Sequence, residues 1–360
     1  MRRSLFAAMA LFALLITACK PPSLIPLPSP SPTAVPLPSN TPIPSTAPLP
    51  SSTPQPTASP TPAASVFACA TVAFLPGGGR ILGRSGPELQ IFDLASMAQI
   101  DRIKAPSNLT TAALSPDGET LAWAQEDNTI QLVRLSDHQI LHSLTGHTDV
   151  VTKLKFTPDG TRLVSASHDT WVRMWDMDGK QVGAFQPTGA LDWTSAVMGL
   201  GISPDGKLLA TAPVDGPVKL WDLATYQKAA ELGGTGAYDT SDVGFSPDGK
   251  YVAADLATGF FLWRVADGRA LLDDKTPINS MAFDFSPDGR TLAYADLYNV
   301  ILSSPDGAQV LHTLEGHTSP VWNLLFSPDS SKLVSSDGVE VRIWQVPDGS
   351  LLYEGKSACP

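Results

Sequence analysis

The chain has 360 residues, of which 43% are hydrophobic and only 16% charged, and its formal net charge is −11. This length can bury a sizeable core, in one large β domain or in two ordinary domains. The acidic balance argues against a phosphate-binding surface, which needs clustered lysines and arginines, and no run of these residues follows the two arginines at the start. We therefore predict no nucleic-acid partner.

The beginning of the chain has the pattern of an export signal. Two arginines precede the apolar run 5–16, and small residues lead to Cys19. The run is too short to span a bilayer as a helix, which needs about 20 residues. Ile16–Cys19 resembles a bacterial lipobox, which implies that residues 1–18 are a signal peptide and that Cys19 is acylated. An ordinary cleaved signal is the alternative. The resemblance predicts a bacterial cell membrane lipoprotein on the extracytoplasmic side.

Residues 19–65 are predicted to hold the lipidated cysteine and a proline-rich linker. Positions 21–62 contain 16 prolines and 14 serines or threonines, with no charged or aromatic residue. Proline removes backbone donors, so we expect neither helix nor sheet but an extended spacer of about 130 Å, at about 3.1 Å per residue. The segment is interpreted as a stalk or as a linker with no special task. Its composition also suits O-glycosylation.

Seven copies of one turn pattern divide the folded region, which we predict over residues 66–360. The pattern is an apolar residue, then Ser or Thr, then Pro-Asp-Gly, and successive copies are 40 to 46 residues apart. Proline presets φ for the turn, aspartate bonds to nearby backbone, and glycine supplies a positive φ. Five full copies and two variants (the last two) begin at Leu114, Phe156, Ile202, Phe245, Phe285, Phe326 and Phe74.

Strand-like runs flank each turn. In the third copy they cover residues 151–156, 162–167, 171–176 and 181–185. Four short strands in a period of this length are typical of a propeller blade. The sequence therefore predicts an all-β fold, a seven-bladed β-propeller with four antiparallel strands per blade. The last blade, with predicted strands 339–346 and 350–355, is complete from its own residues.

The third copy resembles a WD40 repeat almost throughout. It has Gly146-His147, a serine-rich second strand, Asp169 and Trp175-Asp176. In that family a His, a Ser or Thr, an Asp and a Trp of one blade form a buried hydrogen-bond chain. The resemblance implies that His147, Ser167, Asp169 and Trp175 form it here. It implies a scaffold role for these residues, in place of the catalytic triad that Ser, His and Asp could also form.

Two other copies retain part of this set. They are the fourth, with Asp215 and Trp221, and the seventh, with His317, Asp337 and Trp344. The seventh copy has lost one residue between Ser335 and Trp344 relative to the third copy. This shorter connection distinguishes its network from that of the third copy.

Two cysteines lie near the ends of the propeller region. Cys69 precedes the first turn by five residues, and Cys359 follows Trp344 by fifteen. Between ordinary neighbouring blades the equivalent positions are three residues apart on one loop, which is compatible with the Cα separation of a disulfide, about 4.4–6.8 Å. An exported domain is in an oxidising setting. We predict a Cys69–Cys359 disulfide that closes the ring; two free thiols are the alternative.

We predict no cofactor and no metal site. No cysteine pair has metal spacing, no glycine-rich phosphate loop precedes a helix, and Asp176-x-Asp178-Gly179 lacks the rest of a calcium loop. In WD40 proteins the face with the loops between blades is the usual docking site, and aromatic residues and Met are enriched at interfaces. The candidate partner-binding residues are Val150, Trp171, Trp193, Met198, Tyr238, Asp239, Met281 and Trp322.

These observations favour a non-enzymatic protein-binding or scaffold module, with a monomeric head that takes a protein or peptide partner. Two alternatives stay open. One is a propeller enzyme of hydrolase or lactonase type with a central-channel site, for which the sequence has no dense His or acidic cluster. The other is a sensor or structural head, which predicts no tight ligand. The fold cannot decide among them, because function is determined by the site.

Overall fold

The computed structural model describes residues 70–85, 88–105, 108–187, 196–237, 242–256, 259–273 and 280–356, with backbone only at 70–72, 85, 215 and 234–237. These ranges form strands and turns without a helix. Accordingly, nothing in them is a helix long and apolar enough to cross a membrane. Cys19, Cys69 and Cys359 lie outside the described residues, so the acylation and the disulfide stay predictions.

The described strands form seven antiparallel sheets of four strands each, in chain order. Blade 1 is β1 (Ala70–Phe74), β2 (Arg80–Ser85), β3 (Glu88–Asp93) and β4 (Ala98–Lys104). Blade 2 is β5 (Leu109–Leu114), β6 (Thr120–Gln125), β7 (Ile130–Arg134) and β8 (Ile140–Leu144). Blade 3 is β9 (Val151–Phe156), β10 (Arg162–Ser167), β11 (Val172–Asp176) and β12 (Gln181–Phe185). Blade 4 is β13 (Val197–Ile202), β14 (Leu208–Pro213), β15 (Asp215–Asp222) and β16 (Lys228–Ala237).

The remaining three blades follow the same order. Blade 5 is β17 (Asp242–Phe245), β18 (Tyr251–Leu256), β19 (Gly259–Arg264) and β20 (Ala270–Leu272). Blade 6 is β21 (Phe283–Phe285), β22 (Leu292–Asp296), β23 (Asn299–Ser303) and β24 (Val310–Leu314). Blade 7 is β25 (Asn323–Phe326), β26 (Lys332–Ser336), β27 (Glu340–Gln345) and β28 (Leu351–Lys356). The predicted all-β fold, a seven-bladed propeller with four antiparallel strands per blade, is confirmed.

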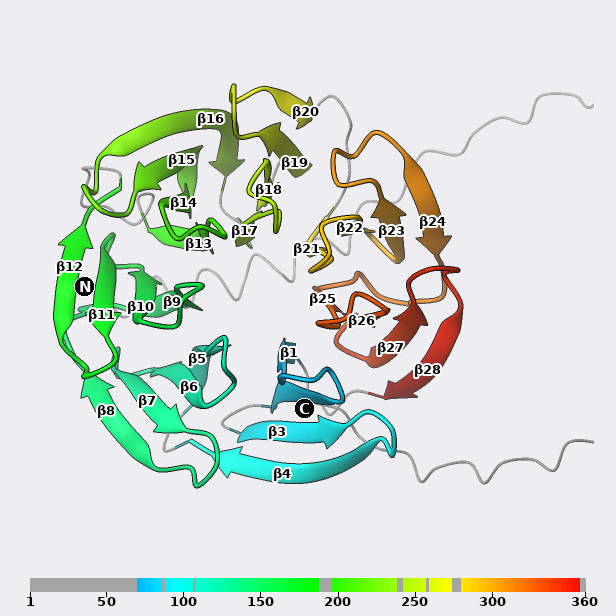
Figure 1. Cartoon of the computed structure of the whole chain (residues 1–360), viewed down its shortest axis with the longest axis horizontal. Helices are drawn as coiled ribbons and strands as arrows, with labels where there is room; N and C mark the ends of the chain where they lie inside the picture. The colour runs from blue at the N-terminus through cyan, green and yellow to red at the C-terminus, as the bar shows by residue number, and fades with distance from the viewer. Residues whose placement is uncertain are drawn as a thin grey trace, which may run out of the picture. The chain divides into compact units, whose positions relative to one another are not determined.

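The blades are arranged in a ring in chain order, with the first strand of each blade nearest the centre and the fourth at the rim (Figure 1). Blade 7 lies beside blade 1, so the ring closes. Every strand of blade 7 comes from residues 323–356, which confirms that the last blade is complete without a strand borrowed from the other terminus.

The hydrophobic core lies between neighbouring blades. Each of seven clusters of buried residues joins one blade to the next. The cluster that closes the ring joins Phe74, Ile81 and Phe92 of blade 1 to Val334 and Ile343 of blade 7. Burial of apolar surface contributes roughly 25 cal/mol per Å², so these interfaces supply the main stabilising term of the ring.

The Pro-Asp-Gly turns form as their residues predict. At Ser203 the hydroxyl donates to the carboxylate of Asp205 at 2.6 Å, and accepts from the backbone N–H of Leu208 at 2.8 Å. Gly206 closes the turn with its N–H on the carbonyl of Ser203, at a φ of +69° that favours glycine. The hydrogen bond from Ser203 holds the pKa of Asp205 below its usual range. Each first strand is thereby joined to its second by a self-satisfied turn.

Candidate functional site

A chain of buried hydrogen bonds crosses blade 3. The Nε1 atom of Trp175 donates to Ser165 Oγ at 2.9 Å, Ser165 Oγ lies 2.8 Å from His147 Nε2, and His147 Nδ1 lies 2.8 Å from Asp169 Oδ2. A neutral imidazole that carries its proton on Nδ1 satisfies every member: the indole donates to the serine, the serine to the histidine, and the histidine to the aspartate. All four groups are therefore partnered although they are buried.

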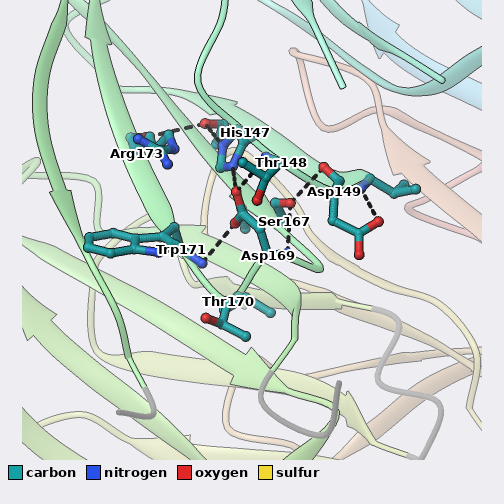
Figure 2. Close-up of polar contacts among 12 residues, drawn as sticks. His147, Thr148, Asp149, Ser167, Asp169, Thr170, Trp171 and Arg173 are labelled. Carbon is teal, nitrogen blue, oxygen red and sulfur yellow. Dashed lines mark hydrogen bonds and ion pairs between the residues drawn. The ribbon is translucent and has the colours of Figure 1, made fainter. Parts of the chain in front are cut away.

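The serine of this chain is Ser165, so the assignment of Ser167 was wrong. Ser167 Oγ donates to the backbone carbonyl of Asp149 at 2.9 Å and accepts from the backbone N–H of Asp169 at 3.0 Å. Figure 2 shows Ser167 turned toward Asp149, while Asp169 faces His147. The pairing of β10 with β9 shifts register between Ala166 and Ser167, which places Ser167 at the inter-blade loop. Ser167 therefore supports the loop, and Ser165 links the rings.

Asp169 holds two loops together. Its Oδ2 accepts the backbone N–H of Thr148 at 3.0 Å, and its Oδ1 accepts the backbone N–H of Trp171 at 2.9 Å (Figure 2). Burial opposes ionisation of this carboxyl, but the hydrogen bond and charge of His147 and the two backbone donors outweigh it and lower the pKa of Asp169. Because Trp171 is tied to this turn, β11 begins at Val172, one residue after the predicted start.

The contacts of Ser165, His147 and Asp169 match the connectivity of a catalytic triad, but their surroundings do not. The side chain of His147 is 1% exposed, Ser165 is fully buried, and its oxygen already accepts from Trp175. A nucleophile must reach its substrate and be free to attack. Since this serine has neither property, the geometry supports a scaffold role for the four residues.

Part of the same chain is described in blade 4, and most of it in blade 7. In blade 4, Trp221 Nε1 donates to Thr211 Oγ1 at 2.8 Å, and the side chain of Asp215 lies outside the described atoms. In blade 7, Trp344 Nε1 and His317 Nε2 both lie 2.7 Å from Ser335 Oγ. His317 Nδ1 is 3.2 Å from Asp337 Oδ2 but lacks hydrogen-bond geometry. The shorter connection between Ser335 and Trp344 thus preserves the Trp–Ser–His part and loosens the His–Asp part.

Three groups that could ligate a metal meet in blade 7, where one atom each of His317, Asp337 and Glu340 lies within 4.8 Å of the others. The two carboxylates already have partners, and His317 contacts Ser335 through Nε2. Asp337 Oδ1 accepts the backbone N–H groups of Val339 and Glu340 at 2.9 and 2.6 Å, and Glu340 pairs with Arg342 at 3.1 Å. We therefore assign the cluster to the polar network of the blade.

The inner strands carry charges that face one another across blade 4. Lys153 and Lys155 on β9 lie 3.5 and 3.7 Å from the Oδ2 atom of Asp242 on β17. Burial opposes ionisation of Asp242, but the two lysines outweigh it and lower its pKa.

On β21, Asp284 accepts the backbone N–H of Phe326 at 2.7 Å, which joins blade 6 to blade 7. Burial raises the pKa of Asp284 to about 7, against the opposing effects of that hydrogen bond and Lys155.

We expect Asp284 to make the stability of the propeller pH-dependent. Between its ordinary pKa of 3.8 and the folded value of about 7, the folded chain retains a proton that the unfolded chain has lost, so stability falls as the pH rises. Asp284→Asn keeps an acceptor for Phe326 and removes the titration. Relative to wild type, the variant should gain on the order of 1–2 kcal/mol between pH 5 and pH 8 in urea denaturation, an amount reduced by the partial exposure of the group. Parallel pH profiles of the two proteins would contradict this role.

The structure describes five of the eight predicted partner-binding residues. Val150, Trp171 and Met198 are partly buried in blades 3 and 4, and Trp171 lies under the guanidinium of Arg173, 5.5 Å from the ring centre. Trp193, Tyr238 and Asp239 lie outside the described residues. Met281 and Trp322 are 41% and 60% exposed, in blades 6 and 7. Of the described candidates, these two are therefore the available anchors.

Five large apolar side chains are exposed at one end of blades 6 and 7. They lie where a first strand begins or where the second strand turns into the third, and these positions share one face of antiparallel sheets. We call them the apolar patch: Met281, Leu297, Tyr298, Trp322 and Val339. Leu297, Tyr298 and Val339 are not among the residues predicted from the sequence to bind a partner. The signal for them is an apolar residue in a turn where other blades have polar ones, such as Asp127-Asn128.

Backbone hydrogen bonds join the segments of the apolar patch in series. The N–H of Ala295 donates to the carbonyl of Ala282, the N–H of Val321 to Leu297, and the N–H of Trp322 to Ser336, at 2.8 to 2.9 Å. Each bond connects two of the turns that carry the exposed residues. The patch is therefore held on bonded loops that span two blades.

Comparisons with known proteins agree with the fold. A family model described as "WD domain, G-beta repeat" matches residues 138–176 and 308–345. These matches fall on parts of blades 2 and 3 and of blades 6 and 7, and the second ends at Gln345 of β27. The chain therefore carries WD40 repeats in a seven-bladed β-propeller.

Three proteins with similar sequences differ in how much of their length is matched. The chain is 25% identical to rat apoptotic protease-activating factor 1 over 264 residues, which are 71% of this chain and 17% of that protein. It is 34% identical over 111 residues to an uncharacterized WD repeat-containing protein, sll1491, of Synechocystis sp., covering 30% and 32% of the two chains. It is 35% identical over 121 residues to protein groucho of Drosophila melanogaster, covering 31% and 16%. The chain thus spans about a third or less of each of these relatives.

Proposed function

We propose that this protein is a non-enzymatic binding module that docks a protein or peptide on the apolar patch. The observation that carries the proposal is the exposure of five large apolar side chains side by side on blades 6 and 7. Contiguous exposed apolar surface marks interaction sites in soluble domains, and Trp and Tyr are enriched among the residues that dominate binding energy. Trp322 and Tyr298 provide both residue types at the centre of the bonded loops.

Two further features support this proposal. The name of one relative, apoptotic protease-activating factor 1, describes action on another protein. The triad-like residues of blade 3 are buried and fully partnered, which favours binding over hydrolysis. The lipobox-like Ile16–Cys19 and the proline-rich segment complete the proposal: a lipid on Cys19 holds the head outside a bacterial cell, where the patch meets its partner.

The experiment is site-specific photo-crosslinking in the native envelope. A photoreactive amino acid at position 298 should capture one dominant protein. Trp322→Ala or Met281→Ala should reduce that product at least tenfold, because loss of a central anchor typically costs about 2 kcal/mol or more and each 1.4 kcal/mol is a factor of about ten. The matched control is Val310→Ala, which shortens an equally exposed apolar residue on the outer strand β24. Yields that fall equally in all three variants, or a product that also forms from position 310, would overturn the assignment of the patch.

A further inference from the structure

The described segments that carry the apolar patch hold charges of one sign. In the described segments 280–282, 296–299, 315–322 and 336–340, the charged residues are Asp296, Glu315, Asp337 and Glu340, and none is lysine or arginine. Asp337 is buried and hydrogen-bonded, whereas Asp296, Glu315 and Glu340 reach solvent. The patch therefore has an acidic rim.

Two described cations of blade 7, Arg342 and Lys356, lie beside Glu340 of this rim. Arg342 is 7% exposed, and its Nη2 atom is already shared between Glu340 at 3.1 Å and Glu354 at 3.3 Å. Lys356 lies opposite Glu340 in the register of β27 and β28, at the outer edge of the blade. Asp296 ends β22 of blade 6, and Glu315 follows β24 of the same blade. In the described segments that carry the patch, the charge is therefore negative.

The exposed aromatic residues also favour a positively charged ligand. The side chains of Trp322 and Tyr298 are 60% and 48% exposed, so part of each ring is accessible to a partner. A guanidinium or ammonium group is attracted to the face of such a ring, with a contribution of about 0.5–2 kcal/mol. An acidic rim and open aromatic rings thus select the same chemical group.

We infer that the apolar patch binds a cationic peptide segment in which apolar or aromatic anchors alternate with lysines or arginines. The apolar side chains of the peptide pack on Met281, Leu297 and Val339. Its lysines or arginines face the carboxylates of Asp296 and Glu315 and the rings of Tyr298 and Trp322. An acidic partner is rejected because its charges would meet carboxylates, and like-charge contacts across an interface cost several kcal/mol. This inference rests on the proposed function and defines the chemistry of its partner.

The experiment compares three synthetic peptides on the purified full-length chain by fluorescence anisotropy. All three share two Trp and two Leu anchors, and their intervening residues are Lys and Arg, Gln, or Glu. We expect the basic peptide to bind about tenfold more tightly than the Gln peptide, and the Glu peptide to bind more weakly still. Raising the salt from about 0.1 M to about 1 M should remove the basic preference, because the Debye length falls from ~10 to ~3 Å.

Variants of the rim test whether its carboxylates cause the preference for the basic peptide. Asp296→Asn with Glu315→Gln should reduce the basic-to-Gln ratio to about threefold or less and leave the Gln peptide unaffected. Glu340 stays intact because it pairs with Arg342. The matched control is Glu119→Gln with Asp178→Asn, which removes the same charge from exposed turns at the opposite end of the blades. Trp322→Ala should weaken both peptides.

The outcomes separate this inference from the proposed function. Equal affinity for the basic and Gln peptides, both lost in Trp322→Ala, would overturn the cationic inference and retain the docking patch. Basic binding that survives Trp322→Ala, or that the control pair reduces as much as the rim pair, would place the peptide elsewhere and overturn the inference. Absence of binding by all three peptides would also overturn it, while crosslinking at position 298 would still decide the proposed function.

Discussion

Ser165→Ala should lower the free energy of unfolding by about 2–4 kcal/mol. The substitution removes the acceptor of Trp175 Nε1 and the partner of His147 Nε2, and leaves both groups buried. A buried polar group without a partner costs about 1–3 kcal/mol, and this substitution leaves two such groups. Urea denaturation followed by tryptophan fluorescence measures the loss. The removed hydroxyl is small, so the cavity itself adds little.

Ser167→Ala is the control for this expectation. It is the neighbouring buried serine on the same strand, and its bonds go to the backbone of Asp149 and Asp169. We expect a loss of about 1 kcal/mol. Trp175→Phe should make Ser165→Ala less costly, because the orphaned indole donor is then absent, and a double-mutant cycle measures this coupling. Equal losses for the two serines, with additive effects of Ser165→Ala and Trp175→Phe, would show that Ser165 does not link the rings.

Gly201→Ala should destabilise the ring by about 3 kcal/mol. Gly201 lies on the inner strand of blade 4, and a Cβ atom there would lie 2.6 Å from the backbone carbonyl oxygen of Val243 on blade 5. A backbone atom of a paired strand cannot rotate away, so the two inner strands must separate, and overpacking of this kind typically costs 1–3 kcal/mol. The separation also disturbs the cluster that joins blades 4 and 5. The midpoint of urea denaturation measures the effect.

Gly79→Ala is the matched control for steric overlap. A Cβ at Gly79 would meet no atom within 4 Å, and its φ lies outside the left-handed region. We expect a change of about 0.5 kcal/mol or less, in the stabilising direction if the substitution restricts the unfolded chain. A Gly201→Ala variant as stable as Gly79→Ala would mean that blades 4 and 5 are further apart than described.

The architecture of the propeller was predictable because its determinants are local. Each Ser/Thr-Pro-Asp-Gly turn satisfies its own hydrogen bonds, as Ser203, Asp205 and Gly206 show. The blade boundaries follow from the spacing of these turns. Three of the four predicted strands of blade 3 have the observed bounds, and the fourth differs by one residue because Trp171 is bonded to Asp169.

The serine of the buried chain was not predictable from the strand alone. Ser165 and Ser167 are two residues apart, so the alternation of a strand places both on one face. Which of them meets His147 depends on the register between β9 and β10, which shifts at Ser167, and on the approach of Trp175 from β11. These are relations between strands, and a residue pattern within one strand does not contain them.

The sequence by itself determined the number of blades, the four strands of each and the turns that connect them, because periodicity and turn chemistry act over a few residues. Only the tertiary structure decided which apolar side chains remain exposed. Met198 and Trp322 precede or begin comparable inner strands, yet Met198 is partly buried and Trp322 is 60% exposed. The exposure of such a residue depends on how closely the loops of the neighbouring blade approach it. The packing of blade against blade in the closed ring sets that distance.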